Sequence, residues 1–293
     1  MPTLLPLGHG YSADALARRL LPEGWHVIGS TRSAAKAEAL AGRGVEPLVW
    51  EGGPSEALAA AIDRADHLLI SAAPKASEEV SGDPVLAAAR EAVAERARAF
   101  AWVGYLSTIG VYGDRAGGWV DEAAERRPAT ERGRARVAAE DDWLALHRDT
   151  GLGVHVFRLA GIYGPGRGPF EKVRAGTARR IVKDGQVFSR IHVDDIAAVL
   201  KASIARPCPG AVYNVCDDEP APPQDVLAHA AALLGREPPP EVAFEAAELS
   251  AMARSFYAES KRVSNTRIKH DLSVALAYPS YREGLAAVLA AEG

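Results

Sequence analysis

Short apolar runs alternate with helical patterns through the first half of this 293-residue chain, and this alternation constrains its fold most strongly. Parallel strands need a crossover between them, and the helix between two apolar runs supplies it. Right-handed crossovers then give a doubly wound α/β fold with a parallel sheet. We expect Pro6 near the end of the first strand, because proline lacks the N–H that a central strand uses. The expected strands are 3–5, 26–30, 46–50, 67–71, 101–106 and 154–159, and the expected helices are 13–20, 34–41, 57–62 and 85–100.

A glycine-rich turn, residues 8–13, joins the first expected strand to the first expected helix. This order of strand, turn and helix is the context that a Rossmann dinucleotide-binding fingerprint requires. The helix N-terminus offers free N–H groups and a positive dipole end to phosphates. An ordinary strand-to-helix turn is the alternative, since glycine turns are common. On the first reading, the cofactor phosphates lie at Gly8, Gly10, Tyr11, Ser12 and Ala13.

The end of the second expected strand indicates which dinucleotide binds. An acidic residue there binds the ribose 2′-hydroxyl of NAD, whereas an arginine accommodates the 2′-phosphate of NADP. No Asp or Glu occurs between Glu23 and Glu38, and Arg32 stands at the expected position. A solvated arginine at the start of a surface helix is the alternative, but the missing acid and the present base favour NADP(H) over NAD(H). The remaining expected cofactor contacts are Thr31, Ser33, Ser71 and Ala72.

Composition and charge exclude several classes of protein. The net charge is −4 and the pI is about 6.1, so no basic surface indicates nucleic acid. The sequence contains no apolar run long enough to span a membrane and no signal peptide, so we expect a cytoplasmic protein that binds no membrane. Cys208 and Cys216 form no metal-ligand pattern, and we expect no metal and two buried, reduced thiols.

Proline and glycine become frequent after residue 164, with proline clusters at 220–223 and 238–240. Such clusters end helices and favour extended connectors. We therefore expect a dinucleotide-binding Rossmann domain in residues 1–165, completed by about 186–216. The remaining residues, 166–185 and 217–293, form a smaller C-terminal substrate lobe on this interpretation.

Several motifs in one order resemble the extended short-chain dehydrogenases/reductases, the NAD-dependent epimerase/dehydratase family. They are Ser107–Asp114, Gly161–Gly166, Arg190–Asp195, Tyr213–Val215 and Tyr278–Leu285. Each motif is modest, but the ordered set spans nearly the whole chain. The resemblance implies a Rossmann-type domain with a substrate lobe, and it places Tyr163 beside the cofactor.

The family's chemistry rests on a Ser or Thr, a Tyr, and a Lys four residues after that Tyr. The resemblance places Thr108 at the hydroxyl position, where it would polarise the substrate oxygen. Arg132 occupies the Tyr position and Arg136 the Lys position. Arginine stays protonated and has no acceptor, so it serves poorly as a general acid and not at all as a base. The chain therefore resembles an atypical branch that lacks the Tyr-x-x-x-Lys dyad.

Proton transfer in such a site needs another group. The resemblance places Tyr112 and Tyr163 beside the crevice, and His192 is a further titratable candidate. For all three, a structural hydrogen bond is the alternative. Ile109 and Gly110 stand where sugar dehydratases of the family carry Asp-Glu, which argues against dehydration by that route.

Two hypotheses for the function remain open at this point. The chain is an NADP-dependent oxidoreductase or epimerase-like enzyme for a small anionic or hydroxylated substrate, or it is a non-catalytic NADP(H)-binding or redox-sensing module. In the enzyme, Arg136 would hold the ribose and Arg132 would orient the substrate, with Lys261–Arg262 and Asn265 near the same anion; a solvated helix face is the alternative for the arginines. The resemblance also implies a homodimer through helices 85–100 and 132–147.

Overall fold

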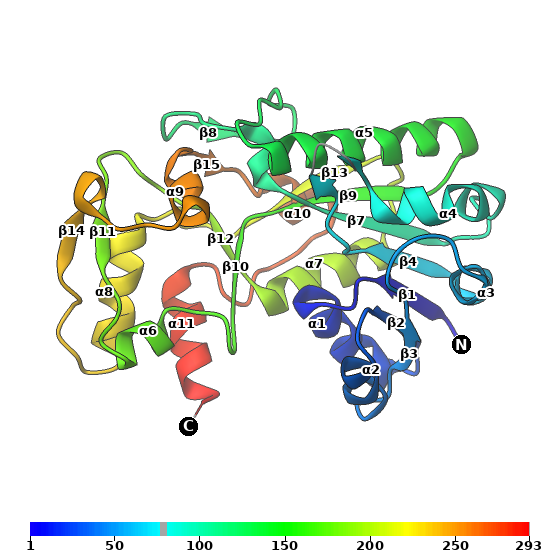
Figure 1. Ribbon diagram of the computed structural model, residues 1–293, viewed down its shortest axis with the longest axis horizontal. Helices are drawn as coiled ribbons and strands as arrows, with labels where there is room; N and C mark the ends of the chain where they lie inside the picture. The colour runs from blue at the N-terminus through cyan, green and yellow to red at the C-terminus, as the bar shows by residue number, and fades with distance from the viewer. Residues whose placement is uncertain (77–80, 293) are drawn as a thin grey trace.

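The computed structural model describes residues 1–76 and 81–292, and its centre is a sheet of seven parallel strands. The strand order is β13-β9-β7-β4-β1-β2-β3. The chain therefore adds β2 and β3 on one side of β1 and the later strands, from β4 on, on the other side. That reversal is the switch point of a doubly wound sheet, and it confirms the predicted Rossmann-type fold (Figure 1). The strands are β1 (Thr3–Leu7), β2 (His26–Thr31), β3 (Glu46–Val49), β4 (His67–Ile70), β7 (Trp102–Thr108), β9 (Val154–Leu159) and β13 (Val212–Val215).

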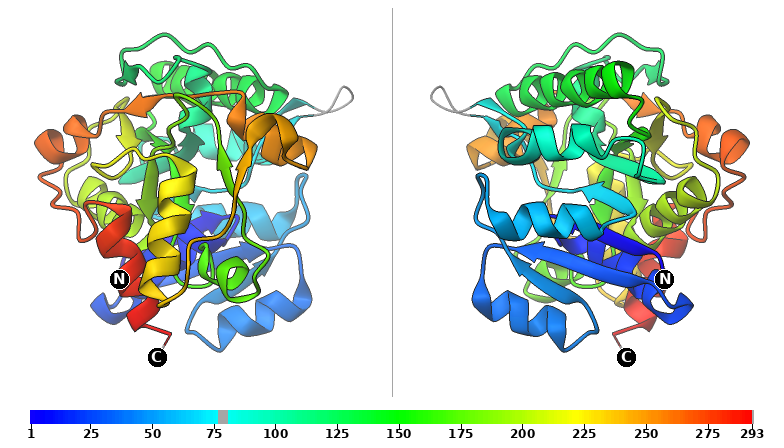
Figure 2. Two further views of the ribbon diagram at one scale, coloured as in Figure 1. Left: turned by 90° about the vertical axis from the view of Figure 1, so that its left-hand side faces the viewer. Right: turned by 90° about the vertical axis from the view of Figure 1, so that its right-hand side faces the viewer.

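Helices cover both faces of the sheet (Figures 1 and 2). Apolar side chains of the first and seventh helices pack on one face, and those of the third, fourth and fifth helices pack on the other. Within the described residues, no helix is both long and apolar enough to cross a bilayer. The helices are α1 (Tyr11–Leu20), α2 (Ala34–Ala41), α3 (Glu56–Arg64), α4 (Pro84–Glu95), α5 (Glu131–Thr150) and α7 (Val193–Ala205).

Pro6 lies inside the central strand β1, one residue before its end. The carbonyl groups of Thr3 and Leu7 accept hydrogen bonds from the β4 side, so the backbone nitrogen of Pro6 faces β2. Pairing between β1 and β2 stops at Leu4, because Pro6 has no N–H with which to continue the ladder on that side. Pairing with β4 continues through Leu7, so the strand keeps its place in the sheet.

Two local expectations are wrong. The helix predicted over 85–100 ends at Glu95, because the chain turns there and Arg96 donates to the carbonyl groups of Asp63 and Ala65. The cysteines also differ from each other: Cys216 is buried at the end of the sheet, whereas Cys208 is exposed in the turn before β13. Cys208 lies on the surface because its backbone N–H reaches the buried ring of His155, which leaves the side chain outside.

Apart from α7 and β13, much of the chain after β9 builds a smaller lobe at one end of the sheet (Figure 1). Its core joins Tyr163 and Phe170 to Val226, Tyr281 and Leu285. The division at residue 165 and the exact limits of the lobe stay predictions. The lobe contains α6 (Phe170–Arg174), α8 (Pro223–Leu233), α9 (Ala251–Tyr257) and α11 (Tyr281–Ala290), with β10 (Gly161–Tyr163) paired to β12 (Arg190–His192) and β11 (Arg180–Val182) paired to β14 (Glu241–Ala243).

A short strand pair ties the C-terminal part of the chain to the first half. β8 (Trp119–Val120) follows β7 in the chain, and it pairs with β15 (Arg262–Val263). This pairing brings Lys261 close to the loop after β7. The other short elements are β5 (Lys75–Ala76), β6 (Ser81–Gly82), α10 (Thr266–Asp271) and the 3-10 turns η1 (Leu21–Glu23), η2 (Ile109–Tyr112) and η3 (Phe244–Ala246).

Candidate active site

The glycine turn between β1 and α1 is built for close backbone approach. Gly8 has a φ of +95°, and a Cβ there would lie 2.7 Å from the backbone nitrogen of Ala72. The Gly8 N–H donates to the hydroxyl oxygen of Ser30 at 2.7 Å, which fixes the turn against the end of β2. Only glycine fits this position, because a side chain would meet both left-handed strain and backbone atoms.

The first turn of α1 leaves its N–H groups available for a ligand. Gly10 is the N-cap residue and has no side chain that could occupy them. Ser12 and Ala13 are buried, and Ala13 packs into the core beneath the turn. A helix start of this kind, with free N–H groups and a positive dipole end, suits a pyrophosphate. The residues here therefore fit a dinucleotide.

Two hydroxyl groups, of Thr31 and Ser33, flank the Arg32 side chain at the end of β2. The hydroxyl oxygen of Thr31 accepts from the Ser33 N–H at 3.4 Å, and the Ser33 hydroxyl oxygen accepts from the Lys36 N–H at 3.4 Å. Both oxygens act as acceptors, so their O–H groups remain able to donate. Arg32 is exposed, and it has no hydrogen-bond or ion-pair partner among residues 1–76 and 81–292.

A cavity of about 840 Å³ begins at the glycine turn and extends under the lobe. Its size is in the range of small-molecule and cofactor sites. Ser71 at the end of β4 lines it, while Ala72 instead supports the turn through its contact with Gly8. Other lining residues come from α1, the end of β7, α5, β10, β12, α9 and the segments just before β12 and β15. They include Tyr11, Thr108, Arg132, Arg136, Tyr163, Phe188, Arg190, Phe256, Tyr257, Glu259 and Lys261.

Thr108 lines this cavity at the carboxyl end of β7. Its hydroxyl oxygen accepts from the Gly110 N–H at 3.1 Å and thereby caps the 3-10 turn η2. The hydroxyl hydrogen is not used by that contact. A donor is thus available at the point where the resemblance places the polarising hydroxyl.

Arg132 and Arg136 both line the cavity from the first turns of α5. Arg136 donates to the Leu106 carbonyl at 2.5 Å and to the Tyr105 hydroxyl at 3.2 Å. Arg132 is exposed and has no polar partner in the described part of the chain. Arg134, between them, points elsewhere and donates to the Ala129 carbonyl. Where the family's Tyr and Lys would stand, the cavity therefore contains one guanidinium that is hydrogen-bonded and one that is unpartnered within the described residues.

Comparison with known proteins shows to which family these features belong. The model of the "NAD dependent epimerase/dehydratase family" matches residues 7–216, which includes the glycine turn, Thr108 and both arginines. The chain belongs to this family.

The chain is also similar to three individual proteins, one known from its sequence and two from solved structures. It is 32% identical over 243 residues to Protein YeeZ of Escherichia coli K12, which covers 80% of this chain and 84% of that protein. A solved structure from Silicibacter pomeroyi, described as a functionally unknown conserved protein, is 57% identical with a TM-score of 0.90, over 100% of this chain and 99% of that one. UDP-glucuronic acid 4-epimerase from Bacillus cereus in complex with NAD shares the fold, at 16% identity and a TM-score of 0.77, over 98% and 97% of the two chains.

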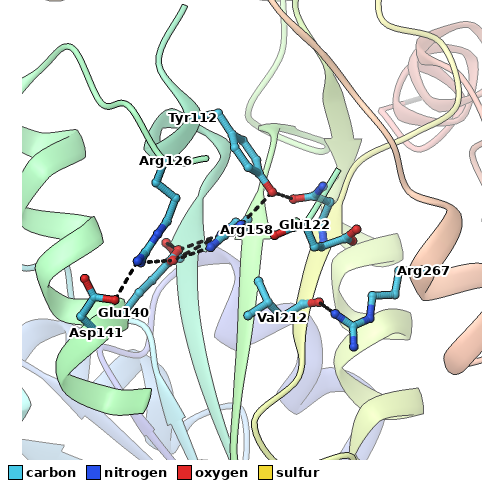
Figure 3. A network of polar contacts seen from close by, with 10 residues as sticks. Tyr112, Glu122, Arg126, Glu140, Asp141, Arg158, Val212 and Arg267 are labelled. Atoms are coloured by element: carbon cyan, nitrogen blue, oxygen red, sulfur yellow. Dashed lines mark hydrogen bonds and ion pairs between the residues drawn. The ribbon is translucent and has the colours of Figure 1, made fainter. Parts of the chain in front are cut away.

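The structure places Tyr112 away from the cavity, unlike the expectation from the family resemblance. The side chain is fully buried, its hydroxyl donates to Asn214 Oδ1 at 2.6 Å, and it accepts from Arg158 at 2.9 Å (Figure 3). Burial raises the pKa of this hydroxyl. The η2 turn rotates the side chain toward β9 and β13, so Tyr112 is a core residue and not a catalytic candidate.

The same network holds a buried ion pair under α5 (Figure 3). Glu140 is fully buried, and its carboxylate accepts from Arg158 at 2.8 Å, from Arg126 at 3.2 Å and from the Ser107 hydroxyl at 2.5 Å. A buried charge of this kind is tolerated when it is paired and hydrogen-bonded. The local sequence does not predict this role of Glu140, because its partners lie 18, 14 and 33 residues away in the chain.

Tyr163 and His192 also have structural partners. Tyr163 lines the cavity, but its hydroxyl donates to the Ser280 carbonyl at 3.2 Å, and burial raises its pKa. The His192 side chain caps α7 by accepting from the Asp194 N–H at 3.2 Å, and burial lowers its pKa. In this structure both residues therefore have the structural hydrogen bond that is the alternative to a role in proton transfer. A cofactor contact of the Tyr163 ring stays a prediction.

Lys261 reaches the cavity from the C-terminal part of the chain. It donates to Glu259 at 2.6 Å and to the Gly113 carbonyl at 2.8 Å. Its neighbours in the sequence motif do not join it: Arg262 donates to the Gly117 carbonyl, and Asn265 donates to Asp218. The cavity residues Phe256 and Tyr257 were missed, because α9 follows a proline-rich stretch that carries no motif.

Proposed function

We propose that this chain is an NADP(H)-dependent oxidoreductase that acts on a small anionic substrate. The observation that carries the proposal is the pair of arginines on α5, of which Arg132 has no polar partner among the described residues, beside the Thr108 hydroxyl in one cavity with the glycine turn. Structural neighbours are described as complexes with NAD, which supports a nicotinamide dinucleotide. The step from NAD to NADP rests on this chain's own residues.

Arg32 supports NADP over NAD. It lies at the end of β2, where the ribose of the adenosine binds in this fold, and it has no protein partner among the described residues. A guanidinium gives a phosphate a charge-assisted hydrogen bond worth about 1.5–3 kcal/mol. No acidic residue stands near it in sequence to bind a 2′-hydroxyl.

Three cavity residues have a role in this proposal. Bound NADPH would supply a hydride to an electrophilic carbon of the substrate. The Thr108 hydroxyl donates to the oxygen that gains charge, and Arg132 binds the substrate's carboxylate or phosphate and orients it. Arg136, fixed against the end of β7, adds positive charge beside the ribose. The proton comes from water in the open cavity, because neither arginine transfers one near neutral pH.

A second candidate function is a non-catalytic NADP(H)-binding module. The absence of the Tyr and Lys from α5 is the specific observation in its favour, since Arg132 and Arg136 occupy both positions. The two candidates share the cofactor site and differ only in turnover.

The first experiment tests the cofactor by calorimetric titration of NADPH and NADH into the purified protein. We expect NADPH to bind at least about tenfold more tightly than NADH, and the Arg32→Ala variant to lose most of that difference by weakening NADPH alone. Arg134→Ala is the matched control and leaves both affinities unchanged. Equal affinities for the two cofactors in the natural protein would contradict the assignment.

The second experiment measures NADPH oxidation with carbonyl compounds in matched pairs, such as phenylglyoxylate with acetophenone and pyruvate with acetone. We expect turnover with the anionic member of a pair, and a higher KM in Arg132→Gln but not in Arg134→Gln. Tight NADPH binding without turnover across the panel would favour the binding module.

A further inference from the structure

The lobe side of the cavity is an aromatic wall, formed by Phe188, Phe256 and Tyr257. The rings of Phe188 and Tyr257 meet edge to face, with centroids 5.5 Å apart. Behind the wall, Phe244 stacks on Tyr257 at 5.3 Å. The Tyr257 ring is therefore held between two other rings, and its orientation toward the cavity is fixed by packing.

Phe256 is the exposed member of this wall. Its relative exposure is 59%, although large apolar side chains usually gain about 1.5–3 kcal/mol from burial. It lies on α9, and Figures 1 and 2 show this helix on the lobe, toward the same side of the molecule as α5. Of the large apolar side chains that are exposed in the described part of the chain, Phe256 is the one that lines the cavity. Together with Phe188 and Tyr257, the exposed Phe256 ring gives the cavity an apolar patch, and apolar patches of this kind are found in ligand-binding grooves.

The α5 side of the same cavity carries two guanidinium groups, and within the described residues neither has a carboxylate within ion-pair distance. Arg132 and Arg136 form no ion pair within residues 1–76 and 81–292, and the acid that lines the cavity, Glu259, is already paired with Lys261 at 2.6 Å. A guanidinium binds a carboxylate through two parallel hydrogen bonds. The cavity thus offers an anion site and a ring site together.

We propose that the substrate of this site is a planar aromatic carboxylic acid, with its carboxylate on Arg132 and its ring against Phe256, Tyr257 and Phe188. This inference rests on the proposed function, because it names the substrate class of the same cavity. Ring-to-ring contact favours a flat aromatic group over a saturated ring of the same size, since edge-to-face and offset-stacked pairs gain more than their buried area. A saturated acid gains only the carboxylate contact with Arg132, and a neutral aromatic compound gains only the ring contacts with the wall.

The test is calorimetric titration of the NADP⁺-loaded protein with three probes of similar size: benzoate, cyclohexanecarboxylate and benzamide. We expect benzoate to bind about fivefold to tenfold more tightly than either of the others. Phe256→Leu, which keeps an apolar side chain but removes the ring, should lower benzoate affinity to that of cyclohexanecarboxylate. Phe256→Tyr should keep the preference. Trp119→Leu removes another exposed ring that does not line the cavity, and it should change nothing.

Three results would overturn the inference. Equal affinity for benzoate and cyclohexanecarboxylate would show that the wall does not select flat rings. Weaker NADP⁺ binding in Phe256→Leu would assign the wall to the cofactor. UDP-glucose binding that is tighter than benzoate and is lost in Phe256→Leu would assign it to a nucleotide. Each of these leaves the proposed function standing, which fails instead if NADP⁺ does not bind or if Arg132→Gln leaves benzoate affinity unchanged.

Discussion

The two sides of helix α5 differ in whether their charged side chains are paired. On the buried side, Glu140 has no exposed surface and is hydrogen-bonded to Arg158, Arg126 and a hydroxyl. On the cavity side, Arg132 has no polar partner among the described residues. Paired buried charges hold α5 against the sheet, whereas the unpaired charge is free for a ligand. One helix therefore supplies both the support of the site and its binding group.

The largest expected effect comes from breaking the buried side. Glu140→Gln keeps the shape but leaves Arg158 buried without a counter-charge, so it should lower the free energy of unfolding by about 3–5 kcal/mol. Arg132→Gln should change that free energy by no more than about 0.5 kcal/mol, because its side chain is exposed. Urea denaturation measures both. A similar loss in the two variants would remove the distinction between the two sides.

A second prediction sharpens the comparison by testing whether the cavity side adjoins a working dinucleotide site. Gly8→Ala should weaken NADPH binding by about tenfold to a hundredfold, since its Cβ would meet the Ala72 backbone at 2.7 Å and displace the turn. Gly24→Ala is the matched control: Gly24 has a φ of +80°, but a Cβ added there would have no atom within 4 Å. It should share the backbone strain and keep the NADPH affinity. Equal weakening in both variants would mean that the turn is not the phosphate site.

A third prediction extends the comparison to another buried acid, Asp217, which lies after β13 and has 1% relative exposure. Unlike Glu140, it forms no ion pair within the described residues, and neither of its carboxylate oxygens has a hydrogen bond of normal geometry. Its pKa is raised to about 8, mainly by burial and to a smaller extent by the nearby Asp218 and Glu219 carboxylates. Arg190 and the Glu219 N–H act in the opposite direction. The native state therefore keeps a proton that the unfolded chain loses above about pH 4.

The sign of the pH effect follows from that difference. The contribution of Asp217 to stability is complete below its ordinary pKa of 3.8 and is lost as the pH rises through about 8. Asp217→Asn should abolish a decline in unfolding free energy on the order of 4 kcal/mol between pH 5 and pH 8.5, measured by urea denaturation at each pH. The exposed Asp184→Asn should keep the decline. A natural protein whose stability rises over this range would contradict the assignment.

The sequence was sufficient for the sheet, the glycine turn and the family, because strand–helix alternation and ordered motifs are local patterns. The glycine turn was placed correctly since strand, turn and helix are contiguous in the chain. The sequence was insufficient for Tyr112, because the direction of its side chain depends on the η2 turn and on Asn214, 102 residues away. The same applies to Glu140 and to the aromatic wall, which gathers Phe188 and Tyr257 from separate elements.

The central claim is that Arg132 binds an anion beside the cofactor, and one measurement tests it most directly. The NADP⁺-loaded protein is titrated with benzoate as the natural sequence, as Arg132→Gln and as Arg134→Gln, which changes a neighbouring arginine that does not line the cavity. We predict at least about tenfold weaker binding in Arg132→Gln, or about 1.4 kcal/mol, and unchanged binding in Arg134→Gln. Identical benzoate affinity in all three proteins would contradict the account.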